Sequence, residues 1–342
     1  MKTGIVKDLR YLDHDMGSSH VESPKRLTAI YDMIDFDFSF PLKTIQPRAA
    51  ELDEIARTHT LSHINMIKDT SGKERVSLDP DTSTSAQSYD TALLAVGGLL
   101  ETCKAVIEGN IQNGFAFIRP PGHHAEASQA MGFCLFNNVA VAAEYLIKNH
   151  GLKRILIIDW DLHHGNGTQH SFYNRSDVLY FSTHQFPFYP GTGHWGEIGD
   201  GAGEGCTVNV PLYGGNGDSD FLYIFKNILS PIAAEFKPDF ILVSAGFDIS
   251  AADPLGGMKV SASGFGALAL ELMSIAKSCC QDRILFTLEG GYDLLSLREG
   301  SKQVLLQLSG NALSPGINAS CSPQLEKELQ SVFEIQRKYW NI

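Results

Sequence analysis

Metal-ligand side chains stand close together at residues 159–164, which read Asp-Trp-Asp-Leu-His-His. The apolar run 155–158 comes directly before them and predicts a buried strand. Because side chains alternate along an extended chain, Asp159, Asp161 and His163 point to one side. Asp161 and His163 can then share one cation, with Asp159 beneath them as an acceptor. The competing interpretation is a strand end with solvated polar residues, although buried charge needs a partner.

Further polar residues follow other predicted strands. In parallel α/β sheets, ligands bind beyond the carboxyl ends of the strands, so we expect these segments to converge on one crevice. There Asp248 would complete a three-ligand site with Asp161 and His163, and three protein ligands with an open position are typical of catalytic zinc. For Asp248 alone, a helix N-cap is the competing interpretation. The segments are Arg-Pro-Pro-Gly-His-His at 119–124, Ser-Ala-Gly-Phe-Asp at 244–248 and Glu-Gly-Gly-Tyr at 289–292.

Adjacent His123 and His124 lie on a predicted Gly-Pro loop, with Asp159 and Asn166 as candidate orienting partners. A histidine bound to a carboxylate gains basicity, whereas one bound to an amide stays neutral more easily. The pair therefore predicts one base and one electrostatic partner. Tyr292 follows two glycines and could donate its phenolic O–H to a developing oxyanion. An incidental loop His-His and a partly buried loop tyrosine are the alternatives.

Apolar residues near these segments could line a narrow slot for an alkyl chain. Phe133 follows Gly132, Tyr189 precedes Pro-Gly-Thr-Gly, and Leu255 lies in Asp-Pro-Leu-Gly-Gly. Ordinary core packing is an equal contender for each of them.

Short apolar runs alternate with longer helix-like stretches along the chain. This pattern predicts an α/β fold, a doubly wound and mostly parallel sheet flanked by helices, in a single domain spanning 1–342 with its core at about 1–310. The predicted strands are 4–6, 115–118, 155–158, 178–181, 207–210, 240–243 and 284–287. The predicted helices are roughly 85–108, 136–149, 219–235 and 262–278, with a last amphipathic helix near 324–340 after the Gly/Ser/Pro-rich stretch 309–323.

The composition limits the classes of molecule that the chain is expected to bind. A net charge of −12 over 342 residues argues against direct binding of nucleic acid and favours cationic substrates such as lysine-rich tails or polyamines. Six cysteines without CxxC spacing indicate reduced, mostly buried thiols of a cytoplasmic protein. The N-terminus has no apolar signal-peptide core, and no apolar run reaches the roughly 18 residues that span a bilayer. We expect no membrane partner, and a homo-oligomer stays open.

Taken together, these segments resemble the zinc-dependent histone deacetylase family, including its bacterial amidohydrolase and acetylpolyamine amidohydrolase relatives. The resemblance spans about residues 1–310, and its wording is closer to the class II branch. The matching segments are His-Val-Glu-Ser-Pro-Lys-Arg-Leu at 20–27, then 119–126, 131–138, 159–169, 189–193, 245–248 and 288–292.

The resemblance implies an arginase/deacetylase-like fold, one catalytic Zn²⁺ and a structural K⁺. It implies metal ligands at Asp161, His163 and Asp248. It implies a catalytic set of His123, His124, Tyr292, Asp159 and Asn166. It implies a substrate tunnel formed by Gly132, Phe133, Tyr189 and Leu255, where Tyr189 departs from the usual phenylalanine and puts a hydroxyl at the tunnel mouth. It implies potassium ligation by backbone carbonyls of Asp159, Asp161, His163, Ser182 and Thr183.

The implied activity is metal-dependent hydrolysis of a linear N-acyl amide such as acetyl-lysine, which releases a carboxylate and a free amine. Hydrolysis of an acetylpolyamine or another small amide would use the same machinery. A non-catalytic acyl-lysine binding module is a third interpretation. A binuclear manganese ureohydrolase needs a further carboxylate two residues past the third ligand, where this chain has Ser250. Fe²⁺ would also tolerate this ligand set.

Overall fold

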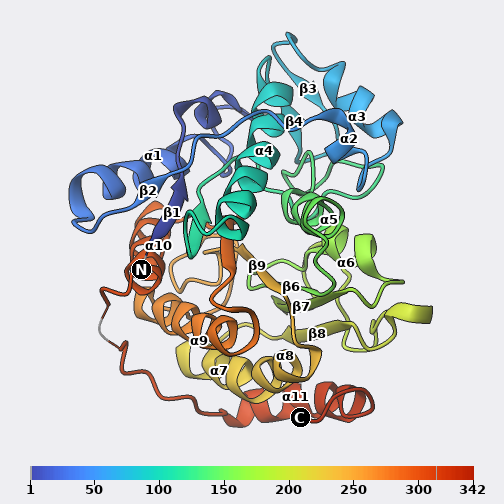
Figure 1. Cartoon of the computed structure of the whole chain (residues 1–342), viewed down its shortest axis with the longest axis vertical. Helices are drawn as coiled ribbons and strands as arrows, with labels where there is room; N and C mark the ends of the chain where they lie inside the picture. Colours follow the sequence, from blue (N-terminus) through green and yellow to red (C-terminus); the bar gives the residue numbers. More distant parts are fainter. Residues whose placement is uncertain (1, 313) are drawn as a thin grey trace.

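The computed structural model describes residues 2–312 and 314–342 and places an eight-stranded sheet at the centre of the chain (Figure 1). The strand order is β2-β1-β5-β10-β9-β6-β7-β8, and all neighbouring strands run parallel. The strands are β1 (Thr3–Val6), β2 (Lys43–Thr44), β5 (Asn113–Ala116), β6 (Ile155–Asp159), β7 (Val178–Gln185), β8 (Thr207–Leu212), β9 (Phe240–Ala245) and β10 (Ile284–Leu288). Strands β3 (Val76–Ser77) and β4 (Ser83–Thr84) form a separate antiparallel pair.

Helices cover both faces of the sheet, and the predicted α/β architecture is confirmed (Figure 1). Helices α4 and α5 pack against each other and against the sheet, and α9 and α10 form the corresponding layer on the other side. The helices are α1 (Lys25–Asp32), α2 (Leu52–Ile55), α3 (Leu61–Lys68), α4 (Ser88–Ile107), α5 (Asn138–His150), α6 (Asn166–Phe172), α7 (Asp218–Ile224), α8 (Ser230–Phe236), α9 (Ala262–Cys280), α10 (Leu294–Leu308) and α11 (Pro323–Gln336).

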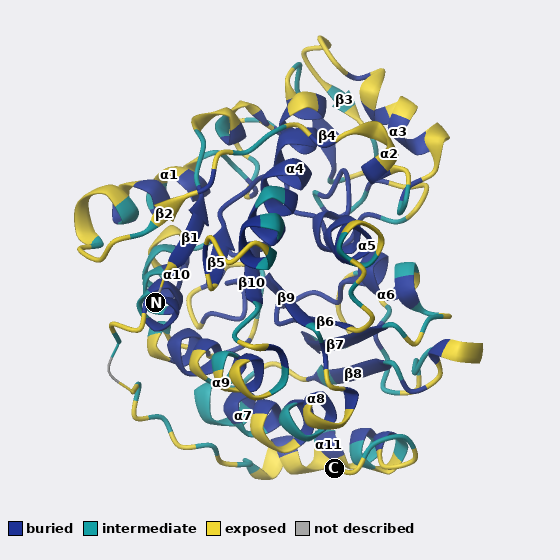
Figure 2. Cartoon of the chain, in the orientation of Figure 1, coloured by how far each residue is buried: buried dark blue, intermediate teal, exposed yellow. Residues whose placement is uncertain are grey.

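The central strands are apolar on both faces because a helical layer covers each face. All five residues of β6 are buried, as are all five of β10 and all six of β9 (Figure 2). In the register of these strands, Asp159 pairs with Ser244 of β9 and with Ser182 of β7. Strands β6, β9 and β10 therefore end within one residue of the same level, whereas β7 runs on to Gln185. The loops after β6, β9 and β10 start from a common edge.

Two predicted elements differ from the structure. The predicted strand 115–118 is wrong at its end: β5 stops at Ala116, because the chain turns toward Arg119-Pro120, and proline restricts the residue before it. The predicted helix 219–235 contains a π-helical turn at Phe225–Leu229 between α7 and α8. This turn precedes Pro231, which lacks the amide N–H of a regular helix.

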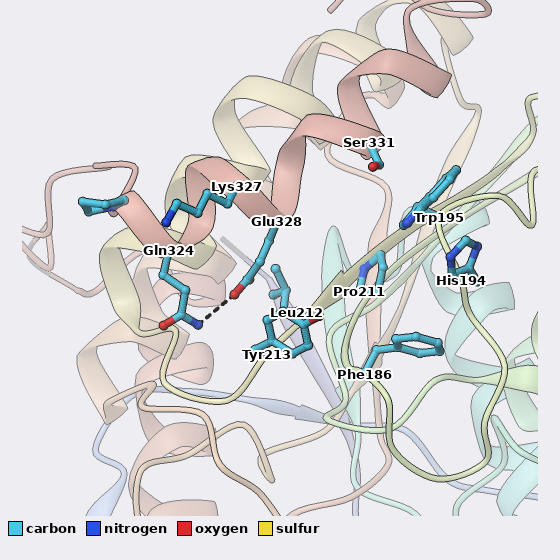
Figure 3. A pocket seen from close by; sticks show the side chains of 11 residues that line it. Phe186, His194, Trp195, Pro211, Leu212, Tyr213, Gln324, Lys327, Glu328 and Ser331 are labelled. Carbon is cyan, nitrogen blue, oxygen red and sulfur yellow. Dashed lines mark hydrogen bonds between the residues drawn. The ribbon is translucent and has the colours of Figure 1, made fainter.

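The C-terminal helix α11 packs on the edge strand β8. Its apolar face buries Leu325, Leu329 and Val332, and the Ser322 hydroxyl caps it by accepting from the Leu325 N–H at 3.2 Å. A groove of about 570 Å³ lies between α11 and the segment after β7, with Trp195 and Lys327 on its walls (Figure 3). The helix thus covers the open edge of the sheet while leaving a hollow beside it.

The cysteines are free thiols, but the prediction that most are buried is wrong for half of them. Cys103, Cys134 and Cys280 are buried, whereas the other three are half-buried. Among the described helices, none combines the length and the hydrophobicity that crossing a bilayer requires.

Candidate metal centre

The three predicted ligands lie together at the carboxyl edge of the sheet. Asp161 and His163 follow β6, and Asp248 follows β9; one ligand atom from each lies within 4.8 Å of the others. His163 Nδ1 is 3.3 Å from Asp161 Oδ1 and 3.1 Å from Asp248 Oδ2. Ligands of a zinc ion each bond at roughly 2 Å, so neighbouring donor atoms lie at such separations. Two oxygens and one nitrogen thus fit a single divalent ion.

Backbone N–H groups orient the two carboxylates. Asp161 Oδ2 accepts from the Gly290 N–H at 2.7 Å, and Asp248 Oδ1 accepts from the Leu162 N–H at 2.9 Å. Each carboxylate therefore keeps its other oxygen toward His163. Glycine is required at 290, since a Cβ there would lie 2.4 Å from Asp248 Oδ2. Contacts of this kind hold metal ligands in place.

The charges of these ligands make a cation favourable. Both carboxylates are buried, with 1% and 0% of Asp161 and Asp248 exposed. Burial and the neighbouring Asp161 charge raise the pKa of Asp248 to about 7. Burial lowers the pKa of His163, but its hydrogen bonds to the two carboxylates outweigh this and raise it to about 9. Two buried acids facing one imidazole leave negative charge that a divalent cation would neutralise.

The two adjacent histidines have different partners. His123 Nδ1 lies 3.0 Å from Asp159 Oδ2, and His124 Nδ1 lies 2.8 Å from Asn166 Oδ1. Burial disfavours charge on both rings, but Asp159 and Asp161 raise the pKa of His123 to about 10. Burial and the neighbouring His123 hold the pKa of His124 well below its usual value. The pair therefore combines a protonated ring with a neutral one.

A buried acid that the sequence argument assigned no role supports this histidine pair. Glu289, the first residue after β10, accepts from the N–H groups of Gly122 and His123 at 2.7 and 3.2 Å. It also accepts from the Ser244 hydroxyl at 3.0 Å. Glu289 thereby ties the histidine loop to the ends of β9 and β10. Its position one residue before the Gly-Gly-Tyr segment is the signal that could have identified it.

A cavity of about 260 Å³ leads to the centre and contains all four predicted tunnel residues. The rings of Phe133 and Tyr292 meet edge-on with centroids 6.0 Å apart, and Tyr189 meets His124 edge-on at 5.1 Å. The ring of Phe188, a residue not predicted from the sequence to line the cavity, stacks on that of His163 with centroids 5.6 Å apart. The remaining lining residues are Asp81, Pro121, His123, Gly132, Leu255 and Gly290.

Gly132 shapes the wall of this cavity. It adopts a φ of +55°, in the left-handed region, and a Cβ there would lie 2.3 Å from the His124 ring. Only glycine allows such a close approach of the backbone to that imidazole. The loop is held from outside by Thr82, whose hydroxyl accepts from the Phe133 N–H at 3.0 Å.

Tyr292 is held at the side of the cavity by groups from distant parts of the chain. The Arg26 guanidinium lies 5.0 Å from the centroid of its ring and donates to the Gly291 carbonyl at 2.7 Å. The backbone N–H of Tyr292 donates to Asp253 Oδ2 at 2.6 Å. Neither Arg26 nor Asp253 was predicted from the sequence to have this role. Together they fix the loop that carries the phenol.

The predicted potassium ligands come from β6, β7 and the loop after β6. The sheet register pairs Asp159 with Ser182, so their backbones are neighbours. The Thr183 hydroxyl is buried and has no hydrogen-bond partner. A cation held by carbonyls at this point stays a prediction.

Residues 20–308 match the family model described as the histone deacetylase domain. The chain belongs to the histone deacetylase family. It is 36% identical to the histone deacetylase HDA1 of Saccharomyces cerevisiae, over 100% of this chain and 53% of that protein. It is also 36% identical to a probable deacetylase of Archaeoglobus fulgidus, over 99% of both chains. The crystal structure of an HDA15 HD domain superimposes with a TM-score of 0.93 at 38% identity, covering 99% of this chain and 95% of that one.

Several of the matched proteins are longer than this chain. The chain spans 44% of the histone deacetylase HDA1 of Candida albicans, to which it is 39% identical, and about half of the Saccharomyces protein. The family and the fold therefore rest on the shared domain, with the archaeal relative matched over nearly its full length.

Proposed function

We propose that this chain is a zinc-dependent deacetylase that hydrolyses the amide bond of acetyl-lysine, releasing acetate and a free lysine amine. The carrying observation is the convergence of Asp161, His163 and Asp248, with donor atoms within 4.8 Å, at the base of a cavity that also contains a histidine pair and Tyr292. Membership of the histone deacetylase family supports this reaction. We treat the whole chain as one catalytic domain.

The cavity suits an acylated lysine side chain. Its walls are aromatic and its base carries the polar groups, so a narrow alkyl chain can pass between the rings while the amide reaches the base. A divalent ion bound by the three ligands would polarise the amide carbonyl and lower the pKa of a water molecule toward about 7. The remaining chemistry belongs to side chains of the protein.

His124 is the candidate general base. Its neutral ring is buried at the cavity, and its Nδ1 is occupied by Asn166, which leaves Nε2 to accept the proton of the attacking water. His123, held protonated by Asp159, stabilises the negative charge that develops beside it and can supply a proton to the leaving amine. Tyr292 donates its phenolic hydrogen to the oxyanion.

A substrate panel tests the proposal. Purified protein is assayed on an acetyl-lysine peptide and on acetylated spermidine, before and after chelation, and again after addition of zinc or iron. We expect turnover of the peptide that chelation abolishes and zinc restores. Turnover of acetylated spermidine alone would indicate a small-amide hydrolase instead. If no acylated amine were hydrolysed by metal-loaded protein, the proposed reaction would be wrong.

A further inference from the structure

The side-chain amide of Asn166 faces two different partners. Its Oδ1 lies 2.8 Å from His124 Nδ1, while its Nδ2 donates to Glu126 Oε1 at 2.5 Å and to the His124 carbonyl at 3.2 Å. A carboxylate accepts hydrogen bonds and cannot donate them. An Asn166 amide turned by 180° would place its oxygen against the Glu126 carboxylate, and two acceptors would repel. Glu126, the closer of the two acceptors, and the His124 carbonyl therefore favour the same orientation of the amide.

The orientation of the amide decides which nitrogen of His124 carries the proton. With Oδ1 toward the ring, the neutral imidazole must hold its hydrogen on Nδ1, so Nε2 is free to accept a proton. In the reversed orientation the amide N–H would donate to Nδ1, and the hydrogen would move to Nε2. A ring in that form cannot act as a base toward the cavity. The acceptor at position 126 thus bears on catalysis through Asn166.

Glu126 is itself held in place. The same Oε1 atom lies 2.7 Å from Nδ1 of His170, which follows Asn166 by one turn of α6. This hydrogen bond is the main cause of a raised pKa of His170. The Glu126 N–H donates to the Gln129 carbonyl at 2.9 Å, and its own carbonyl lies 2.9 Å from Nδ1 of His59. Only 23% of the Glu126 side chain is exposed.

We propose that Glu126 is a positioning residue for the hydrolysis: it fixes the amide of Asn166 and thereby keeps His124 in the form that can accept a proton. His123 contacts the Asp159 carboxylate directly, whereas the Asn166 amide lies between His124 and the Glu126 carboxylate. The inference rests on the proposed function in assigning His124 as the base. Because Glu126 fixes the amide of Asn166, an amide at position 166 is enough to orient His124.

Kinetics of Glu126→Gln test the proposal. Glutamine keeps the shape and can still accept a hydrogen bond, but it can also donate to a reversed Asn166 amide. The selection by the carboxylate is then lost, and only the more distant His124 carbonyl still favours the native orientation. We expect kcat on the acetyl-lysine peptide to fall about tenfold, as for other residues that orient active-site groups, with KM unchanged. Glu144→Gln is the matched control. Glu126, His170 and Glu144 line one outer hollow of about 240 Å³, but Glu144 pairs with Arg175 there, and we expect no change in kcat.

A second substitution should rescue the first. In Asn166→Asp alone, the new carboxylate would face Glu126, and two carboxylates at this distance cannot both ionise. In the double variant Glu126→Gln/Asn166→Asp, the glutamine amide donates to the aspartate, which always presents an acceptor to His124. We therefore expect a higher kcat for the double variant than for either single one. An unchanged kcat in Glu126→Gln would overturn the proposal. So would a double variant whose kcat is reduced by the product of the two factors seen in the single variants.

A spectroscopic readout separates this inference from the proposed activity. In ¹⁵N-histidine-labelled protein, the ring signals that disappear in His124→Gln belong to His124. We expect them to show the hydrogen on Nδ1 in the wild type and a mixture of both forms in Glu126→Gln. The same spectrum for both proteins would refute the role of Glu126 even if no substrate were turned over. Absence of turnover with the expected spectra would refute only the assigned reaction.

Discussion

Two buried clusters of charge meet near Tyr292, and their carboxylates find countercharges in opposite ways. In the first, Glu22 lies between the guanidinium groups of Arg26 and Arg119, and none of the three side chains is exposed. In the second, the carboxylates of the metal centre face a single ligand imidazole. The carboxylate of the first cluster finds its countercharge within the chain, whereas the carboxylates of the second would gain theirs from a bound cation.

This difference separates a cluster that stabilises the fold from one that is suited to bind a metal ion. Burial raises the pKa of Glu22, but Arg119 and Arg26 outweigh burial and hold it well below its usual range. Burial and a like charge instead raise the pKa of Asp248 to about 7. A lowered carboxyl pKa means that folding stabilises the charge, and a raised one means that folding opposes it. The clusters should therefore respond oppositely to substitution.

The largest expected effect comes from removing a metal ligand. Asp248→Ala should lose bound zinc and reduce deacetylase activity to background, because the two remaining ligands cannot hold a catalytic ion tightly. Zinc content by elemental analysis and kcat/KM on an acetyl-lysine peptide measure the two losses. Asp32→Asn, at an exposed position on the end of α1, is the control and should change neither. Stoichiometric zinc in Asp248→Ala would contradict the ligand assignment.

In the cluster of Glu22, Arg26 and Arg119, removing a charged group should instead lower the stability of the fold. Glu22→Gln leaves Arg26 and Arg119 buried without their countercharge, and breaking a buried pair in this way costs about 3–5 kcal/mol. The free energy of unfolding from urea titration measures the loss. Lys7→Gln removes a partner of Asp35 in a surface pair instead and should cost at most about 1 kcal/mol.

The pH dependence of this loss follows from the lowered pKa of Glu22. Its contribution is fully present above the pKa of an unfolded glutamate, about 4.3, and is lost as the pH falls toward the lower pKa of the folded state. The difference in stability between wild type and Glu22→Gln should therefore shrink below about pH 4. A difference that grew on acidification would show that Glu22 is not held ionised by its arginines.

Tyr292 lies between the two clusters, and Arg26, which pairs with Glu22 in the first cluster, lies against its ring. Tyr292→Phe keeps the ring and removes the hydroxyl, so we expect kcat to fall by about 10²–10³, as for loss of one oxyanion donor. Zinc content and the unfolding midpoint should stay at wild-type values. A variant with near-full turnover would mean that the phenol does not contact the reacting oxyanion.

Much of the fold could be predicted because the sheet is buried on both faces. Apolar runs such as 155–158 and 240–243 indicate such strands without help from tertiary contacts. Short or weakly apolar elements were not predicted from the sequence. Strand β2 has only two residues, both exposed, and α10 lies among Gly, Ser and charged residues that give little periodic signal. These elements form because the finished core offers them a surface.

The candidate site shows the same division. Asp161, His163 and Asp248 could be predicted because each follows a strand whose end lies at the common edge of the sheet. Phe188 and Glu126 could not, because their roles depend on loop conformations that bring residues distant in sequence into contact. A sequence pattern therefore identifies ligands and orienting residues next to the strand ends, such as Asp159 and Asn166, but not groups that reach the site through loop conformations.

The smallest expected effect tests whether the buried carboxylates give the metal centre an excess of negative charge when no cation is bound. Asp248→Asn keeps the side-chain shape and an oxygen for the Leu162 N–H, but it removes a buried charge beside Asp161. In metal-free protein this should raise the free energy of unfolding by on the order of 2 kcal/mol at pH 8. The variant would then be more stable than the wild type while binding no zinc.

The sign of its pH dependence is opposite to that of Glu22→Gln. Because the pKa of Asp248 is raised to about 7, ionising it costs folding energy progressively as the pH rises from about 4 to that value. The stabilisation by Asp248→Asn should therefore be small at pH 5 and complete at pH 8 in thermal unfolding of chelated protein. With zinc bound, the wild type should become the more stable protein. A metal-free Asp248→Asn less stable than wild type at pH 8 would show that the cluster is balanced without a cation.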